Sequence, residues 1–246
     1  MSTNNKEVIE KFNTGQIRYF ERFIKRTMVP REDRYLRRHV EEAVRFAEIL
    51  PGDRILEVGC GMGRYTFILA RMGFRVEGLD LTPWLLDRLK EYNAGRYDIP
   101  LHCADIQKPL PELEGKFDAV LGFFTLHHVL DINISYQTMA RLVKPGGKIV
   151  FIEPNPYNIL YYIQIMTTPG MTWKGDGGII RMRKGIILGA MQEAGLSRLK
   201  MSRFGFFPPF ITNTWWGSTV EAVLEKLPLL KPMLPFQLFR GDRIGE

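Results

Sequence analysis

The sequence predicts an α/β fold, a doubly wound and mostly parallel β-sheet with helices on both faces. Short apolar runs alternate with helical stretches from Pro51 onward, as in βαβ units. Those runs lack a strict apolar and polar alternation, which is typical of strands buried on both faces. The 246 residues, 45% hydrophobic and 25% charged, are also enough for an ordinary globular core.

Residues 1–50 precede the first strand and are expected to form an N-terminal helical cap, with helical sequence over 5–50. Apolar residues recur there at three- and four-residue steps, and Pro30 divides them into two amphipathic helices. After this cap the turn Pro51-Gly52-Asp53 begins the βαβ region.

The expected strands are short apolar or β-branched runs separated by turn signals. They cover 54–58, 74–79, 100–103, 117–122, 148–152 and 199–204, and 236–243 is a candidate closing strand. Helices are expected at 64–71, 83–93, 132–142, 183–194 and 215–227. Two segments, 154–182 and 206–235, are rich in aromatic residues and proline and are read as lid insertions. The whole chain, residues 1–246, is therefore interpreted as one domain.

Charge and cysteine content restrict the class of protein. A formal net charge of +7 favours an anionic partner without requiring nucleic acid. The two cysteines, Cys60 and Cys103, cannot build a disulfide framework, which favours a cytoplasmic protein. No His, Cys, Asp and Glu group has metal-ligand spacing, so no metal is expected. A polar N-terminus and the lack of a long apolar run argue against export and membrane spanning.

A glycine-rich loop, Glu57-Val58-Gly59-Cys60-Gly61-Met62-Gly63, joins the first strand to a helix. Glycines at alternate positions allow a sharp turn and let a ligand lie against bare backbone near free N–H groups. A nucleoside cofactor is the expected ligand. Arg64 stands where the dinucleotide motif G-x-G-x-x-G needs glycine, and no P-loop motif occurs.

Two aspartates end successive strands at the same edge of the predicted sheet. Asp80 lies 21 residues after Gly59, where doubly wound folds place a carboxylate against ribose hydroxyls. Asp105 ends the next strand, where a carboxylate can accept from an exocyclic amino group. Either residue alone is as well explained as a helix cap or turn, but the pair favours a cofactor site.

These motifs resemble those of the class I S-adenosylmethionine-dependent methyltransferases. The glycine loop, Asp80, Asp105, the strand Phe117–Gly122 and the segment Leu142–Lys148 stand in family order over residues 53–153. The resemblance implies a single methyltransferase domain with a Rossmann-like, seven-stranded sheet whose last strand is reversed. It also implies S-adenosyl-L-methionine as cofactor, a cofactor-binding core at 51–153 and substrate-side insertions and closing strands at 154–246.

The resemblance assigns cofactor contacts residue by residue. Gly59, Gly61 and Gly63 would pass under the methionine and ribose, and Glu57 opens the same loop. The other implied contacts are Asp80 to the ribose, Leu81 against adenine, Asp105 and the Ile106 backbone at the adenine edge, and Phe123 near the sulfonium.

Candidate catalytic residues follow the fourth and fifth strands. An acceptor hydroxyl or protonated amine needs a base, and His127 and His128 are the nearest histidines. Glu153 could orient the acceptor or act as the base. The alternative is that the histidines pack or hydrogen-bond structurally and that Glu153 belongs to a proline-stabilised turn.

The insertions should choose the methyl acceptor, because ligands bind at the carboxyl edge of a parallel sheet. Their aromatic residues and the basic excess between Trp173 and Phe204 favour a small, partly apolar, acidic or lipid-linked molecule, methylated on O, N or C. Segment 224–239 is a candidate for peripheral membrane contact. The alternatives are an RNA (tRNA) base methyltransferase, against which no long basic run or RNA module is found, and a non-catalytic S-adenosylmethionine-binding protein.

Overall fold

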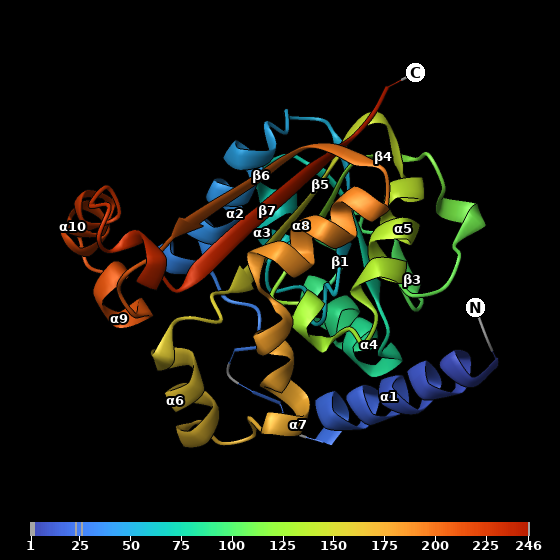
Figure 1. Ribbon diagram of the computed structural model, residues 1–246, viewed down its shortest axis with the longest axis horizontal. Helices are drawn as coiled ribbons and strands as arrows, with labels where there is room; N and C mark the ends of the chain where they lie inside the picture. Colours follow the sequence, from blue (N-terminus) through green and yellow to red (C-terminus); the bar gives the residue numbers. More distant parts are fainter. Residues whose placement is uncertain (1–2, 23, 26, 246) are drawn as a thin grey trace.

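The computed structural model describes residues 3–22, 24–25 and 27–245, and it contains a seven-stranded sheet of order β3-β2-β1-β4-β5-β7-β6 (Figure 1). The strands are β1 (Arg54–Val58), β2 (Arg75–Asp80), β3 (Leu101–Cys103), β4 (Phe117–Phe123), β5 (Val143–Pro154), β6 (Leu196–Phe204) and β7 (Phe236–Arg243). β1 to β5 pair in parallel, whereas β7 runs antiparallel to both β5 and β6. The predicted α/β sheet with a reversed last strand is therefore confirmed.

Ten α-helices are assigned in the described part of the chain. They are α1 (Thr3–Arg22), α2 (Arg34–Ala47), α3 (Thr66–Arg71), α4 (Pro83–Asn93), α5 (Ile132–Leu142), α6 (Ile159–Thr167), α7 (Trp173–Asp176), α8 (Lys184–Glu193), α9 (Pro209–Thr212) and α10 (Gly217–Leu224). Short 3₁₀ turns cover Pro111–Leu113, Leu126–His128, Gly177–Arg181 and Lys231–Met233.

Helices cover both faces of the sheet, as burial of parallel strands requires. On one face Leu36 of α2 and Leu69 of α3 join a core cluster with Ile55 of β1. On the other face Tyr136 of α5 and Ile187 of α8 pack in a second cluster. These two layers fix the strands, so the loops at the carboxyl edge begin from rigid positions.

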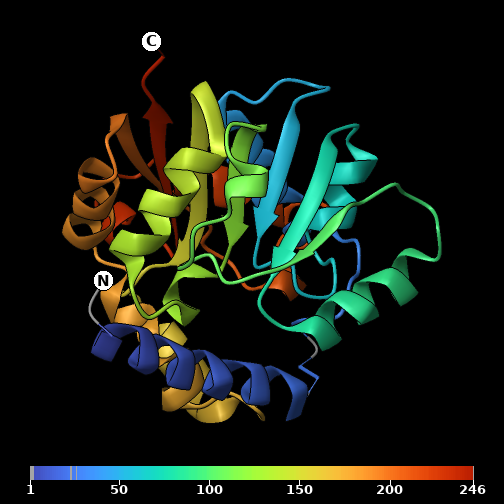
Figure 2. The ribbon, with the colours of Figure 1, turned by 90° about the vertical axis from the view of Figure 1, so that its right-hand side faces the viewer.

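The N-terminal cap and the insertions gather at the carboxyl edge of the sheet. Figure 2 shows α1 crossing below the ends of β1 and β2, beside α6 and α7. The helix expected at 215–227 is shorter, since α10 covers Gly217–Leu224. β5 begins earlier than residue 148 because Val143 pairs with Phe117, and the register then shifts before Ala119 pairs with Lys148.

Among the described residues, no helix combines the length and the apolar character that a membrane span requires.

Candidate active site

A cavity of about 550 Å³ opens at the carboxyl edge of the sheet. Its walls come from the loops after β1 to β4, from the inner face of α1, from α6 and from residues 206–209. The volume falls within the roughly 300–1,000 Å³ typical of small-molecule sites. Segments far apart in the sequence therefore converge on one binding space.

The glycine loop supplies the floor of this cavity. Gly59 and Gly61 have φ values of +74° and +52°, in the left-handed region that favours glycine. A Cβ on Gly59 would lie 2.3 Å from Oγ1 of Thr125, whereas a Cβ on Gly61 would meet no heavy atom within 4 Å. Gly59 thus allows the ends of β1 and β4 to approach, and Gly61 faces open space. Gly63 is not among the lining residues and packs beneath Phe67.

Asp80 braces the glycine loop from the end of β2. One carboxylate oxygen accepts from the Gly61 N–H at 2.9 Å, and the other accepts from the Thr82 N–H at 2.9 Å. Burial raises the pKa of the Asp80 carboxyl, although these backbone hydrogen bonds lower it. Asp80 lines the cavity, so each oxygen keeps lone-pair capacity for a ligand.

Asp105 lines the cavity and is hydrogen-bonded to α1. Its Oδ2 accepts from Nδ2 of Asn13 at 2.8 Å, and its Oδ1 accepts from the N–H of Gln107 at 2.9 Å. Nε2 of Gln107 also donates to Oδ1 of Asn13 at 3.2 Å. Sequence reasoning missed Asn13 and Gln107. The polar Asn13 on an otherwise amphipathic helix is the signal that could have found the first of them.

The remaining residues assigned to the cofactor fall into two groups. Leu81, Ile106 and Phe123 line the cavity, and Phe123 stacks on Tyr65 with ring centroids 4.4 Å apart. Glu57 lies behind the loop and is not among the lining residues. Burial raises the pKa of Glu57 to about 8, so this side chain binds a proton more readily than an exposed carboxylate.

His127 faces the cavity, with Glu153 directly behind it. Nδ1 of His127 lies 2.7 Å from Oε2 of Glu153, and both side chains are buried. Oε1 of Glu153 accepts from the N–H groups of Thr125 and Leu126, at 2.8 and 2.6 Å. The carboxylate of Glu153 is an acceptor, so Nδ1 of His127 is the nitrogen that donates to it, and Nε2 is the nitrogen that carries the lone pair of the neutral ring.

His128 is held by a backbone carbonyl. Its Nδ1 lies 3.0 Å from the oxygen of Gly175, an acceptor only, so this nitrogen carries the ring proton. Desolvation lowers the pKa of His128 well below its usual range, and the neighbouring His127 lowers it further. His128 is therefore held in its neutral form.

A buried ion pair lies beside the histidines. Nζ of Lys25 is 3.2 Å from Oδ1 of Asp176, and the Tyr19 hydroxyl also donates to Asp176. Asp176, His127 and His128 present ligand atoms within 4.8 Å of one another, a grouping invisible in the sequence spacing. The ion pair with Lys25 offsets the negative charge of Asp176 within this cluster.

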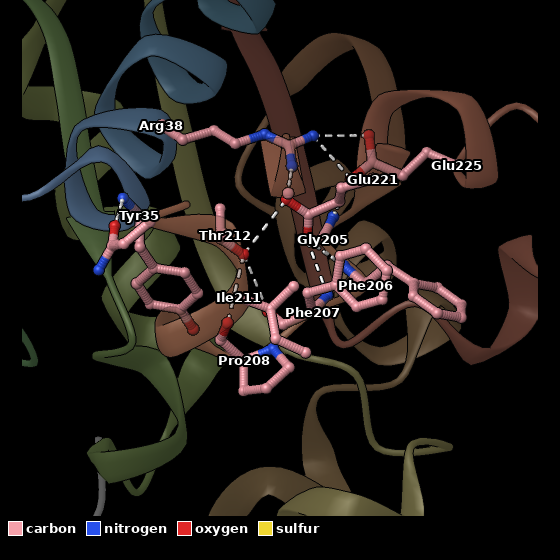
Figure 3. A network of polar contacts seen from close by, with 12 residues as sticks. Tyr35, Arg38, Gly205, Phe206, Phe207, Pro208, Ile211, Thr212, Glu221 and Glu225 are labelled. Atoms are coloured by element: carbon pink, nitrogen blue, oxygen red, sulfur yellow. Dashed lines mark hydrogen bonds and ion pairs between the residues drawn. The ribbon is translucent and has the colours of Figure 1, made fainter. Parts of the chain in front are cut away.

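One wall of the cavity is aromatic, and part of it comes from the segment after β6. Phe206 and Phe207 line the cavity together with Tyr161 of α6 and Phe236 of β7. Figure 3 shows the polar network that holds this segment, centred on Arg38, Glu221 and Glu225. Other aromatic residues expected in the lid lie elsewhere: Phe204 is buried in the core, whereas Tyr157, Phe210 and Trp215 are exposed.

The fold and the glycine-loop cavity are those of a class I S-adenosylmethionine-dependent methyltransferase. A family model described as "Methyltransferase domain" matches residues 56–151, the part of the chain that holds the glycine loop, Asp80 and Asp105.

The chain is also similar to named proteins. It is 29% identical over 165 residues to a ubiquinone biosynthesis O-methyltransferase of Chromobacterium violaceum, covering 65% of this chain and 71% of that protein. It is 38% identical over 108 residues to its counterpart in Paracidovorax citrulli, covering 43% and 45%. The latter match therefore spans less than half of that relative. Among solved structures, a geranyl diphosphate C-methyltransferase from Streptomyces coelicolor has a TM-score of 0.61 at 16% identity, covering 95% and 98%.

The residues present fit the adenosyl cofactor of this class. The loop exposes bare backbone at Gly61, and the buried Asp80 carboxylate borders the same space. Carboxylate oxygens suit hydroxyl donors, and the apolar side chains of Leu81 and Ile106 suit a flat heterocycle. The part of the cavity beside the ends of β1 to β3, called the cofactor half below, therefore suits the cofactor, and the remainder lies against the end of β4 and the insertions.

Proposed function

We propose that this enzyme methylates a hydroxyl or amine of a small, partly apolar acceptor, with His127 as the general base. The observation that carries this proposal is the His127–Glu153 pair, 2.7 Å apart, with His127 lining the cavity. A base is required where the attacking atom carries a proton that it must lose, as a hydroxyl or a protonated amine does. The pair therefore suits an O or N acceptor.

When bound, S-adenosylmethionine supplies an electrophilic methyl group on a sulfonium. The protein's part is to position the acceptor, which is worth roughly 7–11 kcal/mol in well-oriented reactions. Nε2 of His127 receives the acceptor proton, and Glu153 stabilises the imidazolium that results. The aromatic wall and α1 exclude water from the reacting atoms. His128, neutral and bound to Gly175, orients the acceptor rather than taking its proton.

A small molecule is favoured over RNA by the shape of the site. The acceptor half of the cavity is enclosed by Tyr161, Phe207 and Phe236, which suit an apolar body. The named relatives support this choice, since one belongs to ubiquinone biosynthesis and another acts on geranyl diphosphate.

We also propose that the protein is cytoplasmic. The free cysteines Cys60 and Cys103 support this location.

The lid bears apolar residues that support contact with a membrane surface. On the two insertions, Leu160 is 64% exposed, Phe210 75% and Trp215 82%. Large exposed apolar side chains are typical of surfaces that bind membranes or other proteins. The exposed Lys226 and Lys231 lie on the insertion 206–235, which also holds Phe210 and Trp215, and they can attract anionic lipids. Arg240 does not contribute, because it is buried and paired with Asp242. A lipid-linked acceptor could then enter directly from the bilayer.

Vesicles of phosphatidylglycerol test this contact. Phe210→Asp with Trp215→Asp should abolish sedimentation with the vesicles. Leu50→Asp is the control, because Leu50 is also an exposed apolar residue but lies at the opposite edge of the sheet. This variant should still sediment with the vesicles. Equal sedimentation of the wild type, the double variant and Leu50→Asp would refute the lid as the contact surface.

Methyl-labelled S-adenosylmethionine incubated with the enzyme and fractionated cell extract tests the activity itself. We expect label in a small product that enters the organic phase. Label in RNA would establish the tRNA alternative. Tight cofactor binding without transfer of label to any extract fraction would instead indicate a non-catalytic binding protein.

A further inference from the structure

The carboxylate of Glu221 is buried although it lies on an insertion far from the cofactor loop. It is 1% exposed on α10. Its Oε1 accepts from the N–H groups of Phe206 and Phe207, at 2.6 and 2.8 Å, and its Oε2 accepts from the Thr212 hydroxyl at 3.4 Å. A buried carboxylate is costly unless it is hydrogen-bonded and paired, so these bonds define its position strongly.

Arg38 fastens this carboxylate to the body of the protein. Its guanidinium, on α2, pairs with Glu221 and also donates to both oxygens of Glu225, at 2.7 and 2.6 Å (Figure 3). Oε1 of Glu225 accepts in turn from the Gly205 N–H at 2.5 Å. Because α2 packs on the sheet core, the insertion is moored to a rigid element.

The backbone held in this way forms the acceptor-side wall of the cavity. Three consecutive N–H groups, those of Gly205, Phe206 and Phe207, end on the two glutamates. Gly205 has φ +81°, and a Cβ there would lie 2.6 Å from the Phe236 ring. The segment therefore turns sharply against β7 and presents Phe206 and Phe207 to the cavity.

We propose that Glu221 is a positioning residue for the methyl acceptor, because it holds the Phe206–Phe207 wall through their backbone N–H groups. This inference rests on the proposed function for the identity of the acceptor half of the cavity. Glu221 does not border the cavity, so it acts on the acceptor through the wall. Its loss should alter acceptor binding while leaving the cofactor half, on β1 to β3, intact.

Hydrogen exchange and calorimetry with S-adenosylhomocysteine test the wall without any acceptor. In Glu221→Ala we expect protection of the Phe206 and Phe207 amides to fall at least about tenfold. The dissociation constant of S-adenosylhomocysteine should stay within about twofold, as should protection in β4 and β5. Glu41→Gln, which alters an exposed carboxylate on α2, is the matched control and should change neither.

The second readout is the transfer of label from S-adenosylmethionine to the organic fraction of the cell extract. Glu221→Ala and Phe207→Ala should both raise the extract concentration needed for half-maximal rate, and Glu221→Gln, which keeps one acceptor oxygen, should lie between them and the wild type. If Glu221→Ala fails to fold, Glu221→Gln is judged by the same criteria. Loss of amide protection throughout the sheet, or unchanged extract dependence when wall protection is lost, would overturn the inference. Failure of the wild type to transfer label would refute the proposed function, while the exchange data would still judge the wall.

Discussion

Nδ1 of His127 lies 2.7 Å from Oε2 of Glu153, a residue at the end of the neighbouring parallel strand. The same glutamate accepts the N–H groups of Thr125 and Leu126, so one carboxylate fixes both the backbone turn after β4 and the tautomer of the imidazole. A single side chain thereby couples loop geometry to proton transfer. This arrangement distinguishes His127 from its neighbour His128, whose ring is held by a carbonyl and cannot gain the same stabilisation on protonation.

Replacing His127 by alanine should remove the base and leave the cofactor site. We expect turnover to fall about 10²- to 10⁴-fold, the usual contribution of general base catalysis. S-adenosylhomocysteine should bind with nearly unchanged affinity by calorimetry. The control is His102→Ala on β3, whose ring pairs with Glu77 outside the cavity. Equal loss of turnover in both variants would remove His127 from the mechanism.

The Asp80 carboxylate should matter for binding rather than for turnover. Asp80→Ala removes the acceptor of the Gly61 and Thr82 N–H groups as well as the ribose-facing charge. Charge-assisted hydrogen bonds are worth about 1.5–3 kcal/mol, so S-adenosylhomocysteine affinity should fall at least about tenfold. Asp87→Ala, at an exposed carboxylate on α4, should have no effect. Unchanged affinity in Asp80→Ala would contradict the assigned cofactor half.

Two glycines with nearly equal backbone angles allow a matched test of close packing. Gly59 and Gly95 have φ values of +74° and +73°. A Cβ on Gly59 would overlap Thr125, whereas a Cβ on Gly95 would meet nothing within 4 Å. Both alanine variants should lose about 1 kcal/mol from the left-handed backbone. Gly59→Ala should lose more stability in urea denaturation and should also lose cofactor binding. Similar losses in both variants would show that the approach to Thr125 is unimportant.

His39 should make the fold sensitive to acid. It is enclosed by Tyr35, Phe124 and Phe236, and burial lowers its pKa to about 3. The unfolded chain protonates near pH 6.5 and the folded chain does not, so stability falls as the pH drops from about 6.5 toward 3, by at most about 1.4 kcal/mol per unit.

His39→Phe keeps an aromatic ring and removes this titration. Its free energy of unfolding should therefore fall less than that of the wild type between pH 7 and pH 5. Urea denaturation at both pH values measures the difference. Parallel decreases in the two proteins would assign the acid sensitivity to other groups.

Much of the sheet could be predicted because its signals are local. The bounds of β1, α4 and α5 match the expected 54–58, 83–93 and 132–142, since each has a clear apolar run between turn or cap residues. The 3₁₀ turns and α6, α7 and α9 were not predicted. These pieces are short and are held mainly by contacts with other segments, as in the capping of Tyr35 N–H by Asn213, 178 residues away.

The fold class, the glycine loop and the aspartates at the strand ends could be predicted without coordinates, because hydrophobic period, turn chemistry and strand order depend on neighbouring residues. Three contacts required the folded molecule: Asn13 with Asp105, Glu153 with His127, and Glu221 with the Phe206–Phe207 wall. Those partners lie 92, 26 and 15 residues apart. Their meeting depends on how helices and insertions pack over the sheet edge, and no local spacing encodes that packing.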